Sequence, residues 1–277
     1  MKVFTFYSNR FDSATTSIAL HENGLDHNVL VHNEEQADNF RKHDTVRGNV
    51  IVTGKPRGLT YQRNAALELM DHGEWAAFLC DDFKEVLSLP AEWIRAKDLK
   101  IPITIENQNA FGFTKDHVIS LKEMFSHFPM LIDVAEANRI HLIGFKLHDN
   151  PLGLGSKFTH RGLADGRFWL VKKSHYRFDE NVQMIDDVQW TAENLVRHRN
   201  VLILNWILPH FKRYTAGGFG SIKERLEQRR RESAYLARRY GPLVRIAKKP
   251  GWPAGTHIRI YGTDKYIEQV RRRMRIL

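Results

Sequence analysis

The stretch that decides the fold is GLTYQRNAALELMDHGEWAAFLCDDF, residues 58–83. It starts with a helical pattern over 59–72, continues into the apolar run WAAFLC at 75–80, and ends in Asp81 and Asp82. A short, continuous apolar run is typical of a strand buried on both faces of a parallel sheet. Adjacent carboxylates repel each other and are costly to desolvate, so this pair requires a cation or hydrogen-bond donors nearby.

Helix and strand patterns alternate around this stretch. Before it, strands are predicted at 2–8, 27–32 and 49–54, with helices at 13–24 and 34–44. After it, strands are predicted at 100–107, 139–147, 167–173 and 201–209, and helices at 114–128 and 181–199, with a long glycine-rich loop at 148–166. This alternation predicts an α/β protein with a doubly wound, mostly parallel sheet. We expect a catalytic domain over 1–220 and a basic helical C-terminal extension over 221–277.

The positive charge of the chain is concentrated at its end. Residues 201–277 hold 18 Lys plus Arg against 5 Asp plus Glu, whereas residues 1–200 hold 24 against 27. A basic segment set apart in this way indicates a polyanionic partner, with nucleic acid as the first candidate. The alternative is a solvated basic helix.

Composition narrows the classes of protein further. No apolar run approaches 18 residues, so no membrane-spanning helix is expected. The first residues read as a strand and lack the apolar core of a signal peptide. The single cysteine, Cys80, excludes an internal disulfide framework and fits a reducing cytoplasm.

The aspartate pair after the buried strand predicts a metal site. Ligands of open α/β sheets bind at the carboxyl ends of the strands. Hard carboxylate oxygens there suit Mg²⁺ or Mn²⁺ bridging a diphosphate. The alternative is that Asp82 caps a helix over the next segment, FKEVLSL.

Several residues around the pair are candidates for binding the rest of a nucleotide ligand. Arg57, Arg63 and Asn64 precede the strand and could reach its edge with charge-assisted contacts to a diphosphate; the alternative is a solvated helix face. Gly217 and Gly218 lie in a turn before the basic helix, where backbone amides can cradle phosphate or simply form a hinge. His210 is a candidate third metal ligand, or else a core or solvated histidine.

A second acidic pair, Asp186 and Asp187, lies at the predicted start of a helix, where negative charge is favourable. Beside a metal–diphosphate site, one of these carboxylates can act as the general base that deprotonates an acceptor hydroxyl. The alternative is a pair of helix-end charges.

The chain contains, in order, the first strand, the Thr-Thr helix, RGLTYQRNAAL, FLCDDF and the later acidic helix. This order resembles that of GT-A-fold glycosyltransferases. The match is closest to the TET-associated, phage-linked group that is expected to glycosylate hydroxymethylated pyrimidines in DNA. The resemblance implies a nucleotide-sugar donor, most simply a uridine diphosphate sugar, and a divalent metal at an Asp-x-Asp motif. Asp82 matches the metal-binding aspartate and Asp81 the middle one, while Cys80 stands where many members have the first aspartate.

Further roles follow from the same resemblance. Ser8 and Arg10 match the loop that contacts the nucleoside, Arg63 matches an arginine of the family pattern, and Asp186 or Asp187 matches the acceptor-activating position. The expected function is therefore metal-dependent glycosyl transfer to a hydroxymethylated base in DNA. Phosphates of the DNA would be bound by basic residues of the extension, namely Arg225, Arg229, Arg230, Arg231, Arg238 and Arg239.

Three other functions remain open at the level of sequence. The same site could glycosylate a carbohydrate acceptor, with the basic segment facing a membrane surface. A nucleotidyltransferase would use a similar aspartate pair, although SNRFDSATT lacks the glycine-rich signature such enzymes usually have near the first strand. A non-catalytic nucleic-acid binder would leave both acidic pairs unexplained.

Overall fold

The computed structural model describes residues 1–7, 14–43, 47–88, 118–146, 158–211, 221–248 and 253–276. In this part of the chain, a central sheet has the strand order β3-β2-β1-β4-β9-β7-β10-β8. Its strands are β1 (Lys2–Phe6), β2 (Asn28–Val31), β3 (Asn49–Val52), β4 (Trp75–Cys80), β7 (Leu142–Phe145), β8 (Phe158–Thr159), β9 (Phe168–Lys172) and β10 (Leu202–Leu204). Neighbours from β3 to β4 are parallel, as are β7 and β10. The predicted α/β class and mostly parallel sheet are confirmed, with β9 and β8 running antiparallel to their neighbours.

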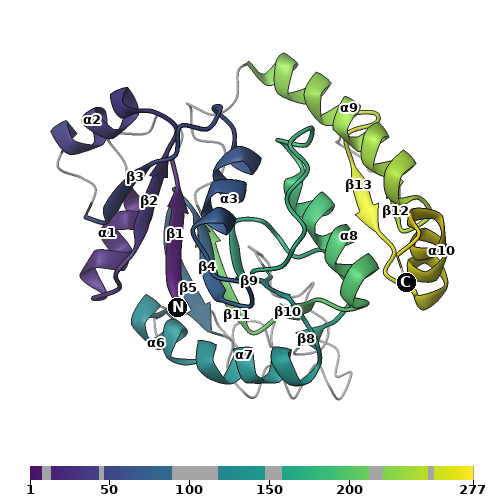
Figure 1. The fold of residues 1–277 in the computed structure, drawn as a ribbon, viewed down its shortest axis with the longest axis horizontal. Helices are drawn as coiled ribbons and strands as arrows, with labels where there is room; N and C mark the ends of the chain where they lie inside the picture. Colours follow the sequence, from purple (N-terminus) through teal and green to yellow (C-terminus); the bar gives the residue numbers. More distant parts are fainter. Residues whose placement is uncertain are drawn as a thin grey trace, which may run out of the picture.

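Helices pack on both faces of this sheet (Figure 1). They are α1 (Thr15–Glu22), α2 (Glu34–His43), α3 (Leu59–Glu68), α6 (Leu121–Ser126), α7 (Phe128–Ala137) and α8 (Asp186–His198). Successive residues of a strand point to opposite faces, so β4 places Phe78 in the core under α3 and α8, and Ala77 and Leu79 in the core under α1, α6 and α7. This two-sided burial is what the continuous apolar run at 75–80 predicts.

A small sheet of order β11-β5-β6 packs against the hydrophobic core that contains Ala77 and Leu79. Its strands are β5 (Phe83–Ser88), β6 (Val118–Ile119) and β11 (Ile207–Phe211). The predicted strand at 201–209 is therefore wrong as one element, because it divides into β10 of the large sheet and β11 of the small one. The predicted helix at 114–128 is also wrong in part: 114–117 lie outside the described residues, 118–119 form β6, and helix begins at Leu121. The predicted strand at 100–107 lies outside the described residues.

The C-terminal segment contains more than a basic helix. It consists of α9 (Ile222–Tyr240), the hairpin β12 (Val244–Ile246) and β13 (Ile258–Ile260), and α10 (Asp264–Met274). Leu236, Tyr240, Ile258 and Val270 belong to the same hydrophobic core as α3 and α8. Figure 1 shows α9 and α10 bordering the side of the molecule next to α8. The extension is thus packed onto the sheet domain through α8, and α9 is the longest basic element among its described residues.

None of the helices in the described part of the chain is long and apolar enough to cross a membrane.

Candidate active site

The turn that holds Asp81 and Asp82 is anchored through its backbone. Thr16 Oγ1 donates to the Cys80 carbonyl at 2.6 Å and accepts from the Phe83 N–H at 3.0 Å. Thr15 Oγ1 donates to the Asp81 carbonyl at 3.2 Å. Both aspartates are half-buried. Because residues 83–88 form strand β5, the alternative in which Asp82 caps a helix is wrong, and the pair instead lies at the turn between two sheets.

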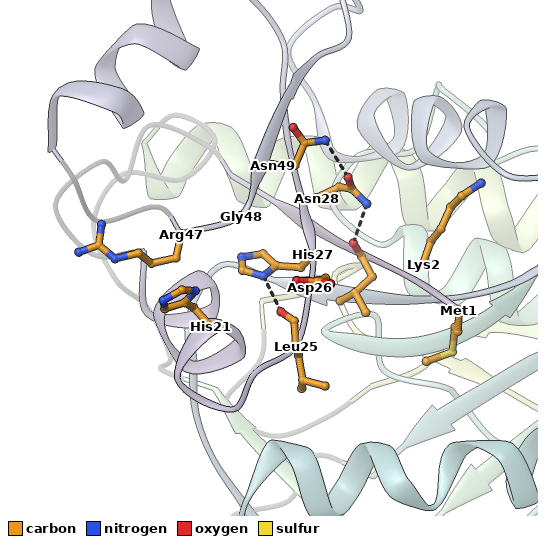
Figure 2. A pocket seen from close by; sticks show the side chains of 11 residues that line it. Met1, Lys2, His21, Leu25, Asp26, His27, Asn28, Arg47, Gly48 and Asn49 are labelled. Carbon is orange, nitrogen blue, oxygen red and sulfur yellow. Dashed lines mark hydrogen bonds between the residues drawn. The ribbon is translucent and has the colours of Figure 1, made fainter.

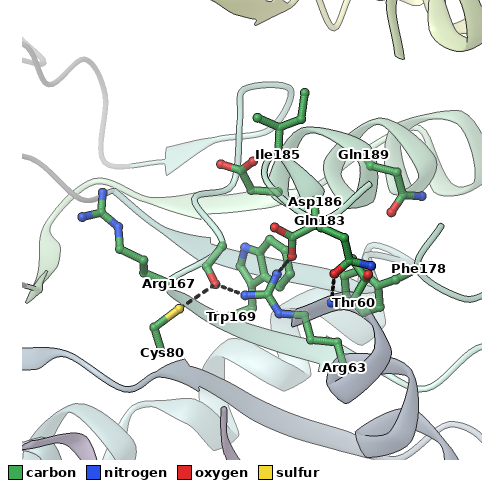
Figure 3. Close-up of polar contacts among 12 residues, drawn as sticks. Thr60, Arg63, Cys80, Arg167, Trp169, Phe178, Gln183, Ile185, Asp186 and Gln189 are labelled. Carbon is green, nitrogen blue, oxygen red and sulfur yellow. Dashed lines mark hydrogen bonds and ion pairs between the residues drawn. The ribbon is translucent and has the colours of Figure 1, made fainter. Parts of the chain in front are cut away.

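Cys80 ends β4 beside the start of β9. Since β9 runs antiparallel to β4, residues 165–167 lie at the carboxyl end of β4, where the Cys80 N–H donates to the Arg167 carbonyl at 2.9 Å. The thiol approaches the Gly166 carbonyl at 3.8 Å (Figure 3). Burial raises the pKa of the Cys80 thiol to about 12. The nearby Arg63 cation opposes this rise, and the Asp82 and Asp81 carboxylates add to it. The thiol is therefore protonated at neutral pH.

Arg63 lies inside the protein, with 1% of its surface exposed. Its guanidinium forms an ion pair with Asp186, donates to the Gly166 carbonyl, and stacks over the Trp169 ring at 4.3 Å from the centroid (Figure 3). Burial lowers the pKa of Arg63 to about 10, so the group stays cationic at neutral pH. The Asp186 carboxylate balances this charge within the core, and the contact of Arg63 with a diphosphate stays a prediction.

Asn64 also ties α3 to the segment before α8. Its side-chain amide donates to the Phe178 carbonyl at 3.1 Å and to Glu180 Oε1 at 3.0 Å, and its oxygen accepts from the Phe178 N–H at 2.9 Å. The neighbouring Arg63 and Asn64 thus hold the two ends of the segment 178–186. Their fixed geometry positions the second acidic pair against the sheet edge.

The two aspartates of that pair have different surroundings. Asp186 is 5% exposed and is held by Arg63, whereas Asp187 is half-buried. Burial raises the pKa of Asp187 to about 6, and the nearby Asp165 carboxylate adds to the rise, while Arg229 and Arg63 oppose it. A carboxyl with this pKa is largely ionised at pH 7 yet basic enough to accept a proton.

Two residues of this site, Asp165 and Arg167, were not singled out from the sequence. The Arg167 guanidinium clamps Asp165 with contacts of 3.0 Å from Nε and 2.9 Å from Nη2. Burial alone would lower the pKa of Arg167, but the hydrogen bonds and charge of Asp165, with Cys80 and Asp82, raise it above its ordinary value. The signal in the sequence was their place at the end of the glycine-rich loop, directly before a strand pattern.

Arg167 and Asp165 connect the two acidic pairs. Arg167 lies within electrostatic reach of Asp82, and Asp165 within reach of Asp187. Gly166, between them, allows a close approach: a Cβ there would lie 3.1 Å from the Cβ of Asp187 and 3.3 Å from an Arg63 nitrogen. The structure therefore brings both acidic pairs into one electrostatic cluster at the carboxyl edge of β4.

His210 lies on β11, where its Nδ1 is 3.1 Å from Glu85 Oε1 on β5. In the described ranges, no three His, Cys, Asp or Glu side chains are grouped so that they could hold a metal ion. The predicted set of Asp81, Asp82 and His210 is thus not assembled as a preformed three-residue centre there. Four other predicted ligand-binding residues lie outside the described residues, namely Ser8, Arg10, Gly217 and Gly218.

Five of the six arginines of α9 fall into two groups. One group faces the protein: Arg229 donates to the Thr256 carbonyl at 2.8 Å and lies in the field of Asp187, and Arg239 pairs with Asp179 at 2.9 Å. The other group is exposed and consists of Arg230, Arg231 and Arg238, of which Arg230 also donates to the Ala254 carbonyl. Arg225 is half-buried. The arginines of α9 therefore do not form a continuous outward-facing stripe.

Two hollows are lined by described residues other than the two acidic pairs. A groove of about 830 Å³ brings Arg57 together with Lys223 at the start of α9 and Arg231 in its middle, with Glu224 and Glu227 also on its wall. The second, of about 370 Å³, lies at the amino ends of β1, β2 and β3 (Figure 2), where the ring of His27 is held by Ser17 and Leu25. Because ligands of parallel sheets bind at the carboxyl ends of the strands, the cluster around Asp82 and Asp187 is the better candidate site.

No protein-family model matches the chain, and no curated protein matches it.

Proposed function

We propose that the protein is a metal-dependent glycosyltransferase that moves a sugar from a nucleotide-sugar donor, a uridine diphosphate sugar, to the hydroxyl of a hydroxymethylated pyrimidine in DNA. One observation supports this above the others. The two acidic pairs converge at the carboxyl edge of β4, and Asp187 among them has a pKa of about 6, suited to a general base. The four parallel strands from β3 to β4, followed by the antiparallel β9, are compatible with a GT-A-like nucleotide-sugar domain.

The donor side is assigned to Asp81 and Asp82. Their hard carboxylate oxygens fit Mg²⁺ or Mn²⁺, which proteins commonly hold with one or two carboxylates while substrate phosphates and water complete the coordination. Such a site does not require a preformed group of three protein ligands. When bound, the ion stabilises the negative charge of the departing diphosphate as a Lewis acid. Thr15 and Thr16 keep the turn in place, and Arg167 adds a cation within reach of Asp82.

The acceptor side is assigned to Asp187. Its carboxylate accepts the proton of the acceptor hydroxyl as the hydroxyl oxygen bonds to the anomeric carbon, and the bond from that carbon to the diphosphate oxygen breaks. Asp165 keeps Asp187 basic, because its nearby negative charge disfavours ionisation of the Asp187 carboxyl. Asp186 takes no part in this proton transfer, since Arg63 holds it in the core.

The DNA side is assigned to Arg57 and to basic residues along α9. Arg57, Lys223 and Arg231 face one groove, and Arg238 lies exposed two turns beyond Arg231. Arg229 links this helix to the site, because its charge reaches Asp187. A target base extruded from the helix stack would place its hydroxymethyl group near Asp187 while its phosphates meet these cations.

The proposal is tested by incubating the protein with Mn²⁺, a panel of sugar nucleotides, and DNA that contains hydroxymethylcytosine or hydroxymethyluracil. The DNA is then digested to nucleosides, which are weighed by mass spectrometry. We expect the mass of one sugar to be added to the hydroxymethylated nucleoside and nothing to be added in matched DNA without the hydroxymethyl group. Transfer to carbohydrate acceptors with none to DNA would refute the proposed acceptor.

A further inference from the structure

Glu232 is a buried carboxylate in the middle of the basic helix α9, with 3% of its surface exposed. It accepts hydrogen bonds from three consecutive backbone N–H groups: those of Gln183 at 2.9 Å, Met184 at 2.9 Å and Ile185 at 3.2 Å. Gln228, one turn earlier on α9, donates to its Oε1 at 2.9 Å. An acidic residue with this many donors serves a defined role rather than merely diluting the positive charge of the helix.

The reason for this arrangement lies at the start of α8. The N-cap of α8 is Ile185, whose side chain cannot accept a hydrogen bond, and in the first turn the N–H of Val188 is instead accepted by Asp187 Oδ1 at 2.8 Å. Glu232, 47 residues further along the chain, accepts from the N–H of Ile185 and so binds the N-cap residue itself. Its negative charge is also favourable at a helix N-terminus. The turn 183–185 therefore depends on α9 for its conformation.

A second contact fixes the same segment from α9. Tyr235 Oη donates to Asp179 Oδ2 at 2.6 Å, and Arg239 pairs with the same carboxylate at 2.9 Å. From the opposite side, α3 holds Phe178 through Asn64 and Asp186 through Arg63. Of these contacts between the extension and segment 178–186, those of Glu232 lie nearest to Asp187 in sequence, and they are made directly with backbone N–H groups.

We propose that Glu232 is a positioning residue that sets the geometry of Asp187 by clamping the turn 183–185, a role that rests on the proposed function of Asp187 as the base. The groups that face Asp187 come from three other places: Asp165 before β9, Arg63 on α3 and Arg229 on α9. The balance among them holds only while the turn keeps Asp187 in place. The basic extension thereby contributes to the chemistry of the site as well as to DNA binding.

The test compares Glu232→Gln with Glu227→Gln, which removes the same charge from an exposed position on the same helix. In the Glu232→Gln variant, an amide NH₂ replaces one carboxylate oxygen and opposes backbone N–H groups, so at least one half of the clamp is lost. We expect exchange of the Gln183, Met184 and Ile185 amides to become about tenfold faster, as for the loss of a hydrogen bond of typical strength. By NMR titration, the pKa of the Asp187 carboxyl should move at least halfway from about 6 toward 3.8, because the loosened turn exposes it. Glu227→Gln should change neither.

Gln228→Ala provides a milder variant in case Glu232→Gln does not fold. It removes one partner of Glu232 Oε1, so exchange of the Gln183 amide should rise by a few-fold while the Met184 amide changes less. Unchanged amide exchange and an unchanged Asp187 titration in a folded Glu232→Gln protein would overturn the inference.

These readouts need no activity, so they separate this inference from the proposed function. If the wild-type protein transfers no sugar, but amide exchange and the Asp187 pKa change in Glu232→Gln, then the proposed function is wrong while the positioning role of Glu232 is supported. If transfer occurs, Glu232→Gln should lower kcat and move the acid limb of the pH–rate profile to lower pH. A merely structural role would lower Tm and leave that limb in place.

Discussion

Asp81–Asp82 and Asp186–Asp187 are the same dipeptide in sequence, yet their surroundings in the structure differ. In the first pair both side chains are half-buried, and the structure fixes the backbone through Thr15 and Thr16. In the second, Asp186 is paired with the buried Arg63 while Asp187 faces Asp165. The surroundings of an acidic pair, rather than the dipeptide itself, therefore determine which of its carboxylates is held in the core by a buried cation.

The largest expected effect is on the first pair. Asp82→Asn should lower transfer by at least about 10⁴-fold, since losing metal-assisted stabilisation of the leaving group costs several kcal/mol. The free energy of unfolding should change little, because Asp82 is half-buried at a turn. Steady-state transfer and chemical denaturation check the two halves of this prediction. Near-native turnover of the variant with Mn²⁺ present would remove Asp82 from the metal site.

The two members of the second pair, Asp186 and Asp187, should show different effects when each is replaced separately. Asp187→Asn should lower kcat about 10³-fold, within the usual range for loss of a general base, and leave the fold intact. Asp186→Asn should instead destabilise the protein by about 3–5 kcal/mol, because it leaves the buried Arg63 charge uncompensated. Urea unfolding and kcat measured on both variants provide the comparison. Equal effects of the two substitutions on stability would contradict the division of roles.

The pH dependence of transfer should report Asp187. Protonation removes its capacity as a base, so the rate should fall about tenfold per pH unit below about 6 and level off above it. Asp165→Asn removes a like charge that raises this pKa, so the acid limb should move to lower pH. A pH–rate profile of both proteins measures the shift. An acid limb that stays in place would exclude Asp165 as a neighbour that tunes Asp187.

The smallest effect concerns the surface beside the second pair. Arg231→Ala combined with Arg238→Ala should weaken DNA binding and flatten its log–log salt slope by about 0.9 for each lost phosphate contact. Both side chains are exposed, so stability should not change. Arg229 is unsuitable for this test, because its contact with the Thr256 carbonyl holds the hairpin segment to α9. Fluorescence anisotropy over a salt series decides it, and an unchanged slope would place the DNA surface elsewhere.

Local pattern was enough to predict much of the fold. The run 75–80 is apolar on both faces because it lies in the middle of the sheet, whereas the helix predicted over 181–199 begins only at Asp186. Direction was not readable, since β9 has the same apolar pattern whether it runs parallel or antiparallel to β4. The division of 201–209 between two sheets also depends on tertiary pairing, as does the hairpin of β12 and β13.

The candidate site was predictable only where a residue stands next to a recognisable element. Both aspartate pairs adjoin a strand end or a helix start, so their positions could be predicted. Asp165 and Arg167 join the site because the antiparallel β9 begins where β4 ends. Glu232 joins the turn before α8 from a distant helix, and the sequence shows it only as an acid among arginines. Arg63 could be recognised as important, but its burial against Asp186 depends on how α3 packs on α8.

In the proposed mechanism, the first pair holds the donor and the second handles the acceptor proton. Calorimetric titration of uridine diphosphate with Mn²⁺ into the wild-type protein, Asp82→Asn and Asp187→Asn separates these two roles. We expect Asp82→Asn to lose metal-dependent binding of the nucleotide, whereas Asp187→Asn should bind it as the wild type does. Binding that survives in Asp82→Asn, or is lost in Asp187→Asn, would refute this division of roles.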